Sequence, residues 1–399
     1  MTADFPLSDL RVLELGSFIA GPFTGRLFAD FGAEVIKVEP PDRPDPLRKW
    51  GDTIDDNGLF WAIQARNKKC ISLNLRTTKG QELLKKILPH VDVVIENFRP
   101  GTLEKWNLGY EVMSEINPRL ILVRTSGFGQ TGPYKDRAGF GSIGESMGGL
   151  RYVTGEPDRP PVRVGISIGD SLAAMYAMIG CLTAIHERSR SGMGQVVDTA
   201  LYEAVFGVME STIPEYVLLD KLRERSGNIL PGVAPSNIYK TGDDSWIAIG
   251  GNADTVFKRL AAVMGQPGLA SDERYATHEA RGKHQKELDE LIEAWTQTKP
   301  CHELLELLST NGVPAGRIYN AKDMVSDPQF IAREMIVPFE HPELGSFPMP
   351  GIVPKLSRTP GQIHHAGPTT IGEHNREIFC DWLGMEESEF LALQSEEVI

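Results

Sequence analysis

The chain has 399 residues, of which 41% are hydrophobic and 24% charged, and its formal net charge at pH 7 is −13. This length predicts two domains, or one domain with a substantial insertion. The acidic balance argues against a broad nucleic-acid-binding surface, which needs clustered Lys and Arg. No secretory signal or membrane-length apolar run is recognised, so we expect a cytoplasmic protein without a membrane partner. The four cysteines are widely scattered, which predicts buried free thiols and no disulfide framework.

The first half of the chain alternates short apolar runs with amphipathic helical patterns. A long, largely apolar helix is predicted at 171–189 and is expected to be buried. A last strand and helix follow at 195–211. Such βαβ repeats predict an α/β fold with a parallel, doubly wound sheet. The predicted strands are 10–15, 33–39, 69–75, 92–97 and 120–126, with helices at 21–31 and 78–88.

A change of composition divides this region from the rest of the chain. Residues 212–235 are rich in charge, Gly and Pro, which is typical of a linker. A smaller α+β domain is expected at 236–330, and 331–399 forms a C-terminal segment with a hairpin at 337–352 and a helix near 373–384. The first domain is therefore predicted to span 1–211. The small domain is predicted to contain a strand at 246–250 and helices near 253–264, 284–296 and 302–311.

Two segments match G-x-G-x-x-G, at 127–132 and 139–144. A dinucleotide site needs a strand directly before the glycines and a helix that opens within them. The first copy runs into a turn at Pro133, and the second follows polar residues, so glycine-rich turns are favoured over nicotinamide or flavin binding. His364 and His365 have no acidic or Cys partner at ligand spacing, so no metal site is predicted.

The segment VGISIGDS at 164–171 offers two nucleophiles. Its GISIG matches the serine-hydrolase elbow, with strand-like residues before it and His278 and His341 downstream. We expect the helix to start after Asp170, with Gly169 making the turn, so Ser167 is interpreted as a turn hydroxyl. Asp170 is then an N-cap or an ionised, nucleophilic carboxylate, and these two roles are compatible.

Five segments in a fixed order together resemble the family III CoA-transferases, the group of formyl-CoA transferase and carnitine CoA-transferase. The resemblance covers nearly the whole chain. It implies an interlocked homodimer with a smaller domain and a large Rossmann-like, CoA-binding domain, to which 331–399 returns. It also implies that a CoA thioester is the substrate and that no cofactor is permanently bound. The segments are LELGSFIAGPFTGRLFADFGAEVIKVEPP, ARNKKCISLNLRTTKG, DVVIENFRPGTLEKWNLGYE, INPRLILVRTSGFGQTGPYKDRAGF and VGISIGDSLAAMYAMIGCLTAIHERSRSGMGQVVDTAL.

The family's nucleophile is an Asp that follows a glycine at the start of a helix, and the matching residue is Asp170. The resemblance implies that CoA passes from an acyl-CoA to an acceptor acid through an aspartyl anhydride and an aspartyl-CoA thioester. Arg76, Lys105 and Arg137 are expected partners of the CoA phosphates. The full set of CoA-contacting positions carried over is Ser17, Phe18, Ile19, Ala20, Leu73, Arg76, Asn97, Phe98, Lys105 and Arg137.

Departures from the family pattern keep several functions open. Pro40 stands where formyl-CoA transferase has an Arg near the adenine, with Arg43 as a neighbouring replacement, and 227–237 stands in for a glycine-rich shielding loop. An α-methylacyl-CoA racemase or epimerase would need a proton-shuttling His where this chain has Phe140. A serine hydrolase that uses Ser167 and a non-catalytic CoA-binding protein also stay open. Succinate, glutarate, oxalate and citramalate are common acids in the family, and the sequence does not choose among them.

Overall fold

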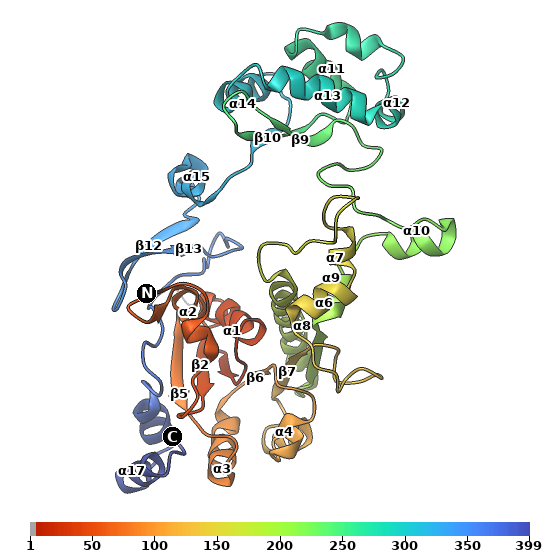
Figure 1. The fold of residues 1–399 in the computed structure, drawn as a ribbon. Helices are drawn as coiled ribbons and strands as arrows, with labels where there is room; N and C mark the ends of the chain where they lie inside the picture. Colours follow the sequence, from red (N-terminus) through yellow and green to blue (C-terminus); the bar gives the residue numbers. More distant parts are fainter. Residues whose placement is uncertain (1–4) are drawn as a thin grey trace. The chain divides into compact units, whose positions relative to one another are not determined.

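A computed structural model describes residues 5–399, and the chain divides into two compact units (Figure 1). The first unit contains the chain up to Arg151, Val164–Pro214 and Ala332–Ile399. The second unit contains Tyr152–Arg163 and Glu215–Ile331. The sequence did not indicate that the short segment Tyr152–Arg163 leaves the first unit.

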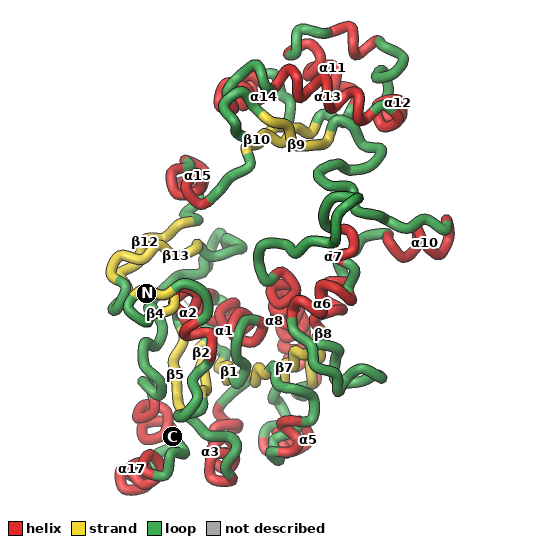
Figure 2. The backbone as a smooth tube through the Cα atoms, in the orientation of Figure 1, coloured by secondary structure: helices red, strands yellow, loops and turns green. Residues whose placement is uncertain are grey.

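A parallel six-stranded sheet forms the centre of the first unit, which confirms the predicted parallel sheet. Its strands lie side by side in the backbone view (Figure 2). They form because short runs rich in Val, Ile and Leu bury both of their faces, as strands of parallel sheets do. In spatial order they are β5 (Lys68–Ser72), β2 (Glu34–Glu39), β1 (Arg11–Glu14), β6 (Val93–Glu96), β7 (Ile121–Ser126) and β8 (Val196–Ala200).

Alternate strand residues face two separate cores, one on each side of this sheet. On one side, Val12, Val93 and Ile121 pack with apolar residues of α1 (Ala20–Asp30) and α8 (Ile168–Ser191). On the other side the core includes apolar residues of α3 (Thr78–Ile87), α5 (Tyr110–Ile116) and α17 (Glu387–Ser395). This unit also contains α2 (Leu59–Ala65), α4 (Thr102–Lys105), α6 (Gly141–Met147), α9 (Leu201–Phe206), the hairpins β3 (Thr53–Ile54)–β4 (Asn57–Gly58) and β12 (Ile336–His341)–β13 (Gly345–Pro350), the 3-10 helices Pro46–Lys49 and Leu88–His90, and the π-helix Glu377–Trp382.

The C-terminal segment packs on the first unit. The N–H of Asn74 donates to the carbonyl of Val398 at 2.8 Å, and Lys79 pairs with Glu396 at 2.5 Å. The blue end of the chain accordingly lies beside α3 (Figure 1). The first unit is thus built from segments at both ends of the described chain.

The second unit has its own core around an antiparallel sheet ordered β11-β10-β9. Tyr239, Ile247 and Leu288 are among its buried residues. The unit contains β9 (Ser236–Lys240), β10 (Trp246–Gly250), β11 (Ala315–Arg317), α11 (Asp254–Val263), α12 (His278–Lys283), α13 (Gln285–Thr296), α14 (Cys301–Thr310), α15 (Ala321–Ser326) and, at its end, α16 (Pro328–Ala332). Near the two boundaries lie α7 (Leu150–Val153) and α10 (Thr212–Leu219), so part of the predicted linker 212–235 is helical.

Several expectations need correction. The strand-like residues before Ser167 form no strand, and α8 begins at Ile168 instead of after Asp170. The same helix is not buried all round, because Met175, Tyr176 and Ile179 are exposed on one face. By length and composition α8 could also cross a membrane, contrary to the expectation from the sequence, although its other face packs on the sheet. Cys380 is half-buried, whereas the other three cysteines are buried thiols as expected.

Candidate active site

The loops that follow adjacent strands meet at the carboxyl edge of the parallel sheet. β1 and β6 are neighbours in the sheet. The next strand along the chain after β1 is β2, and after β6 it is β7, and these two lie on opposite sides of the β1–β6 pair. Such a change of direction opens a crevice between loops, where doubly wound proteins bind their ligands. Ser17 follows β1 and Asn97 follows β6, so both residues lie at this crevice.

A cavity of about 210 Å³ occupies this edge and has Asp170 in its wall. Two of its segments come from the glycine-rich motifs. A Cβ on Gly127 would lie 2.9 Å from the Cα of Gly139, so these glycines allow the two loops to approach closely. Its walls consist of residues 17–20, 97–100, 125–127 and 137–140, together with Asp170 and Leu201.

A second cavity of about 320 Å³ shares Ser17, Phe18 and Phe98 with the first. It adds cationic Arg43 and Arg76 and apolar or aromatic groups that include Leu73, Leu75 and Trp106. Nine of the ten predicted CoA-contacting residues therefore line one cavity or the other. The exception is Lys105, which is exposed on α4 and lines neither.

The loop between the two cavities is held in a specific conformation. Asn97 exchanges two hydrogen bonds with the backbone of Ser17, at 2.8 and 2.7 Å. Phe18 has a φ of 63°, a left-handed conformation that costs a non-glycine residue about 1–2 kcal/mol. Its N–H donates to Asp45 Oδ1 at 3.0 Å, so the surrounding structure fixes a conformation that this residue does not favour by itself.

Asp170 lies in the first turn of α8, and Ser167 is the N-cap residue. The positive end of the helix dipole at this position favours a negative charge. A Cβ on Gly141 would lie 2.1 Å from Asp170 Oδ2, so the carboxylate occupies the space that a side chain at Gly141 would fill. A Cβ on Gly169 would lie 2.9 Å from the carbonyl oxygen of Gly141. Gly169 is therefore helical and permits close approach of α6, and the prediction that it makes a turn was wrong.

The serine-hydrolase interpretation lacks its structural context. No strand precedes Ser167 directly within the described part of the chain, although a nucleophile elbow requires one. His341 Nδ1 instead accepts the N–H groups of Glu343 and Leu344 at 3.2 Å in its own hairpin. The racemase interpretation needs a histidine that moves a proton. Among the described residues, Phe140 lines the Asp170 cavity and no histidine does.

Buried charges beneath the loops are the residues that sequence reasoning missed. Lys37 lies in β2 between Ile36 and Val38, and Asp45 follows the same strand. A charged residue between apolar neighbours in a buried strand needs a partner of opposite charge. The position of Lys37 in the sequence could therefore have indicated a buried ion pair. In β6, burial raises the pKa of Glu96 to about 7 despite the opposing attraction of Arg124. No cluster of potential metal ligands was found among residues 5–399.

The fold and this site define a class, namely an α/β protein with a ligand crevice at the carboxyl edge of a doubly wound sheet. The family model of CoA-transferase family III matches residues 7–375, and the chain belongs to this family. It is 60% identical over 99% of its length to succinyl-CoA–D-citramalate CoA-transferase from Chloroflexus aurantiacus, of which 98% is covered.

Two further relatives extend the comparison. The chain is 36% identical to succinate–glutarate CoA-transferase from Agrobacterium fabrum, over 94% of this chain and 95% of that protein. The crystal structure of a CAIB/BAIF family protein from Brucella suis matches with a TM-score of 0.84 and 35% identity, covering 95% of this chain and 99% of that one. The chain is thus a CoA-transferase.

Proposed function

We propose that this CoA-transferase moves CoA from succinyl-CoA to a dicarboxylic acid, with D-citramalate as the first candidate acceptor. The strongest support is the identity of 60% over nearly the whole chain to an enzyme named for these two substrates. The relative named for succinate and glutarate supports the wider class of dicarboxylates. Arg99 and Arg137 in the wall of the Asp170 cavity supply positive charge that suits carboxylate groups.

Asp170 is the covalent nucleophile in this proposal. Its carboxylate attacks the thioester carbonyl, and breaking the C–S bond gives an aspartyl-acyl anhydride and CoA thiolate. The thiolate then attacks the aspartyl carbonyl, which releases the donor acid and leaves an aspartyl-CoA thioester. The acceptor carboxylate attacks that thioester to form a second anhydride, and the returning thiolate takes the acceptor acyl group and regenerates Asp170. The half-buried position of Asp170 in the cavity wall, which Phe140 and Arg137 also line, supports this role.

The two cavities together suit the two ends of a CoA thioester. Arg43 and Arg76 in the second cavity are placed to meet phosphate groups, and Trp106 and Phe98 offer apolar surface. The shared residues Ser17, Phe18 and Phe98 then lie along the pantetheine chain, with the thioester at the Asp170 end. Lys105 has no part in this arrangement because it lines neither cavity.

The functional protein is proposed to be an interlocked homodimer. The exposed face of α8 carries Met175, Tyr176, Ile179 and Leu182, which recur at helical spacing and form an apolar stripe. A second copy of this chain is the partner that the proposal assigns to this stripe. Light scattering on the purified protein should give twice the 44.0 kDa mass of one chain. A cytoplasmic location remains an expectation.

The function is tested by incubating the protein with a matrix of acyl-CoA donors and acids and identifying the CoA products by mass. We expect succinyl-CoA with D-citramalate to give citramalyl-CoA and succinate, at a higher kcat/KM than pairs with monocarboxylic acids. Release of free CoA without an acyl-CoA product would indicate a hydrolase instead. Deuterium uptake at the acyl α-carbon in heavy water, without CoA exchange, would indicate a racemase.

A further inference from the structure

A buried ion pair contacts the loop that lines both cavities, and its two residues, Lys37 and Asp45, also line the second cavity. Lys37 Nζ donates to the carbonyl oxygen of Gly16 and, at 2.7 Å, to Asp45 Oδ2. Asp45 Oδ1 accepts the N–H of Phe18 at 3.0 Å and the N–H of Leu47 at 2.9 Å. The pair therefore contacts the backbone on both sides of Ser17, the residue shared by both cavities.

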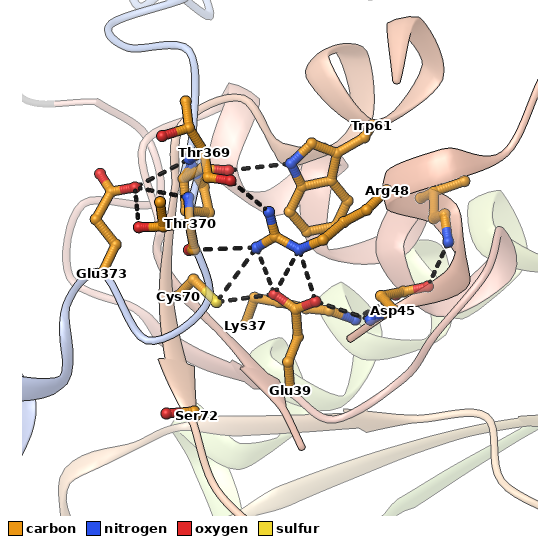
Figure 3. Close-up of polar contacts among 12 residues, drawn as sticks. Lys37, Glu39, Asp45, Arg48, Trp61, Cys70, Ser72, Thr369, Thr370 and Glu373 are labelled. Atoms are coloured by element: carbon orange, nitrogen blue, oxygen red, sulfur yellow. Dashed lines mark hydrogen bonds and ion pairs between the residues drawn. The ribbon is translucent and has the colours of Figure 1, made fainter. Parts of the chain in front are cut away.

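Asp45 is itself fixed by a second layer of polar contacts. Its N–H donates to Glu39 Oε1 at 2.8 Å. Arg48 donates to both oxygens of Glu39, at 2.9 and 2.6 Å, and the thiol of Cys70 donates to Oε2 at 2.9 Å. Figure 3 shows Glu39 at the centre of these contacts, with Lys37 and Asp45 beside it. Asp45 consequently presents its Oδ1 to Phe18 in one orientation.

Lys37 remains charged in this environment. Burial alone would lower its pKa, but the carboxylates of Asp45 and Glu14 raise the pKa above its ordinary value. Lys68 is equally buried and also pairs with Glu14, at 2.7 Å, yet its other contact is the carbonyl of Pro22 in α1. The two lysines thus share the Glu14 carboxylate, although burial lowers the pKa of Lys68, and of the two it is Lys37 that donates to the loop at Gly16.

We propose that Lys37 and Asp45 are positioning residues for CoA-thioester binding, which act by holding Ser17 and Phe18 in the conformation that separates and lines the two cavities. This inference rests on the proposed function insofar as the bound molecule is a CoA thioester. Lys37 supports the loop at the carbonyl before Ser17, and Asp45 supports it at the amide after Ser17. Without Asp45, Phe18 loses the acceptor that compensates for its left-handed backbone, and without Lys37, Asp45 loses the ammonium group that donates to its Oδ2.

The matched variants are Lys37→Met and Lys68→Met, which each remove one buried ammonium group that pairs with Glu14. Free CoA is the binding probe, measured by calorimetry, and thermal unfolding reports stability. We expect both variants to lower the unfolding temperature, because each removes an ammonium group from buried carboxylates: Lys37→Met removes a partner of Asp45 and Glu14, and Lys68→Met removes one of the two partners of Glu14. Only Lys37→Met should weaken CoA binding and raise KM for succinyl-CoA, by about tenfold or more, with a smaller change in kcat.

A second pair of variants covers the case in which Lys37→Met does not fold. Asp45→Asn retains a side-chain oxygen that accepts the Phe18 N–H, whereas Asp45→Ala removes it. We expect Asp45→Asn to bind CoA more tightly than Asp45→Ala. Equal CoA affinity in these two variants, or equal loss of affinity in Lys37→Met and Lys68→Met, would overturn the proposal. Since CoA binding is measured without an acceptor acid, a wild-type protein that binds CoA but transfers it to no acid contradicts only the proposed function.

Discussion

The loop that contains Ser17 and Phe18 lies at the same edge of the sheet as Asp170, but different features of the structure determine their positions. The loop is held by buried charges and hydrogen bonds, from Asp45, Lys37 and Asn97. The Asp170 carboxylate occupies space that is open because residue 141 is Gly and has no side chain. The loop should therefore respond to changes of charge, and the Asp170 carboxylate to the addition of a single methyl group at residue 141.

The largest effect is expected for Gly141→Ala. The added Cβ would lie 2.1 Å from Asp170 Oδ2, so the carboxylate must turn away from its present position. Displacing a reacting group by about 1 Å can lower the rate about a hundredfold, and we expect kcat to fall by this order while CoA affinity stays near wild type. Steady-state kinetics together with calorimetry of CoA binding would separate the two quantities.

Gly148→Ala is the matched control for that variant. Its Cβ would lie 2.7 Å from side-chain atoms of Val205, so it introduces a comparable clash at the other end of α6, away from Asp170. We expect Gly148→Ala to lower stability but to retain kcat in the fraction that folds. An equal loss of kcat in the two variants would show that α6 packing in general, and not the space beside Asp170, controls the reaction.

A smaller effect is expected for Arg76→Ala, which removes an exposed cation from the wall of the second cavity. Arg76 is exposed and pairs with Asp42 at 2.5 Å beside the second cavity. If it meets a CoA phosphate, its loss should raise KM for the acyl-CoA about fivefold at low ionic strength, and less in high salt because ions screen exposed charges. Lys79→Ala, which removes an exposed cation of α3 paired with Glu396, should leave KM unchanged at every salt concentration.

The last prediction concerns stability instead of catalysis, through Glu96, whose Oε2 accepts the N–H of Phe98 at 2.7 Å. Burial raises its pKa from the ordinary 4.5 to about 7. Between these values the folded protein binds more protons than the unfolded chain, so this group makes the free energy of unfolding decrease as pH rises. The slope is at most about 1.4 kcal/mol per pH unit. Denaturant unfolding from pH 4.5 to 8 should show a flatter profile in Glu96→Gln, and identical profiles would contradict the shifted pKa.

The sequence predicted the sheet well because burial leaves a clear periodicity. The strand that contains Val35 and Ile36 and the one that contains Val93 and Val94 are apolar runs of the right length, and the structure confirms them. Resemblance in five ordered segments predicted roles for Asp170 and for the loop at Ser17, and the structure brings both to the wall of one cavity.

The supports of the site were not predicted, because pairings between distant segments leave no local pattern. Nothing near Asp170 in the sequence indicates that Gly141, 29 positions away, leaves the space that its carboxylate occupies. Gly169 was interpreted by the commonest role of glycine, a turn, whereas its role is close helix packing. Lys105 was carried over from family position alone, and α4 places it away from both cavities.

The central claim is that Asp170 forms the covalent bond to the transferred group. Hydroxylamine added during turnover of succinyl-CoA intercepts aspartyl anhydrides and thioesters, and peptide mass spectrometry locates the resulting hydroxamate. The account predicts an aspartyl hydroxamate at Asp170 in the wild-type protein, and neither label nor transfer in Asp170→Ala. A label on Ser167, or an Asp170→Ala protein that still transfers CoA, would contradict it.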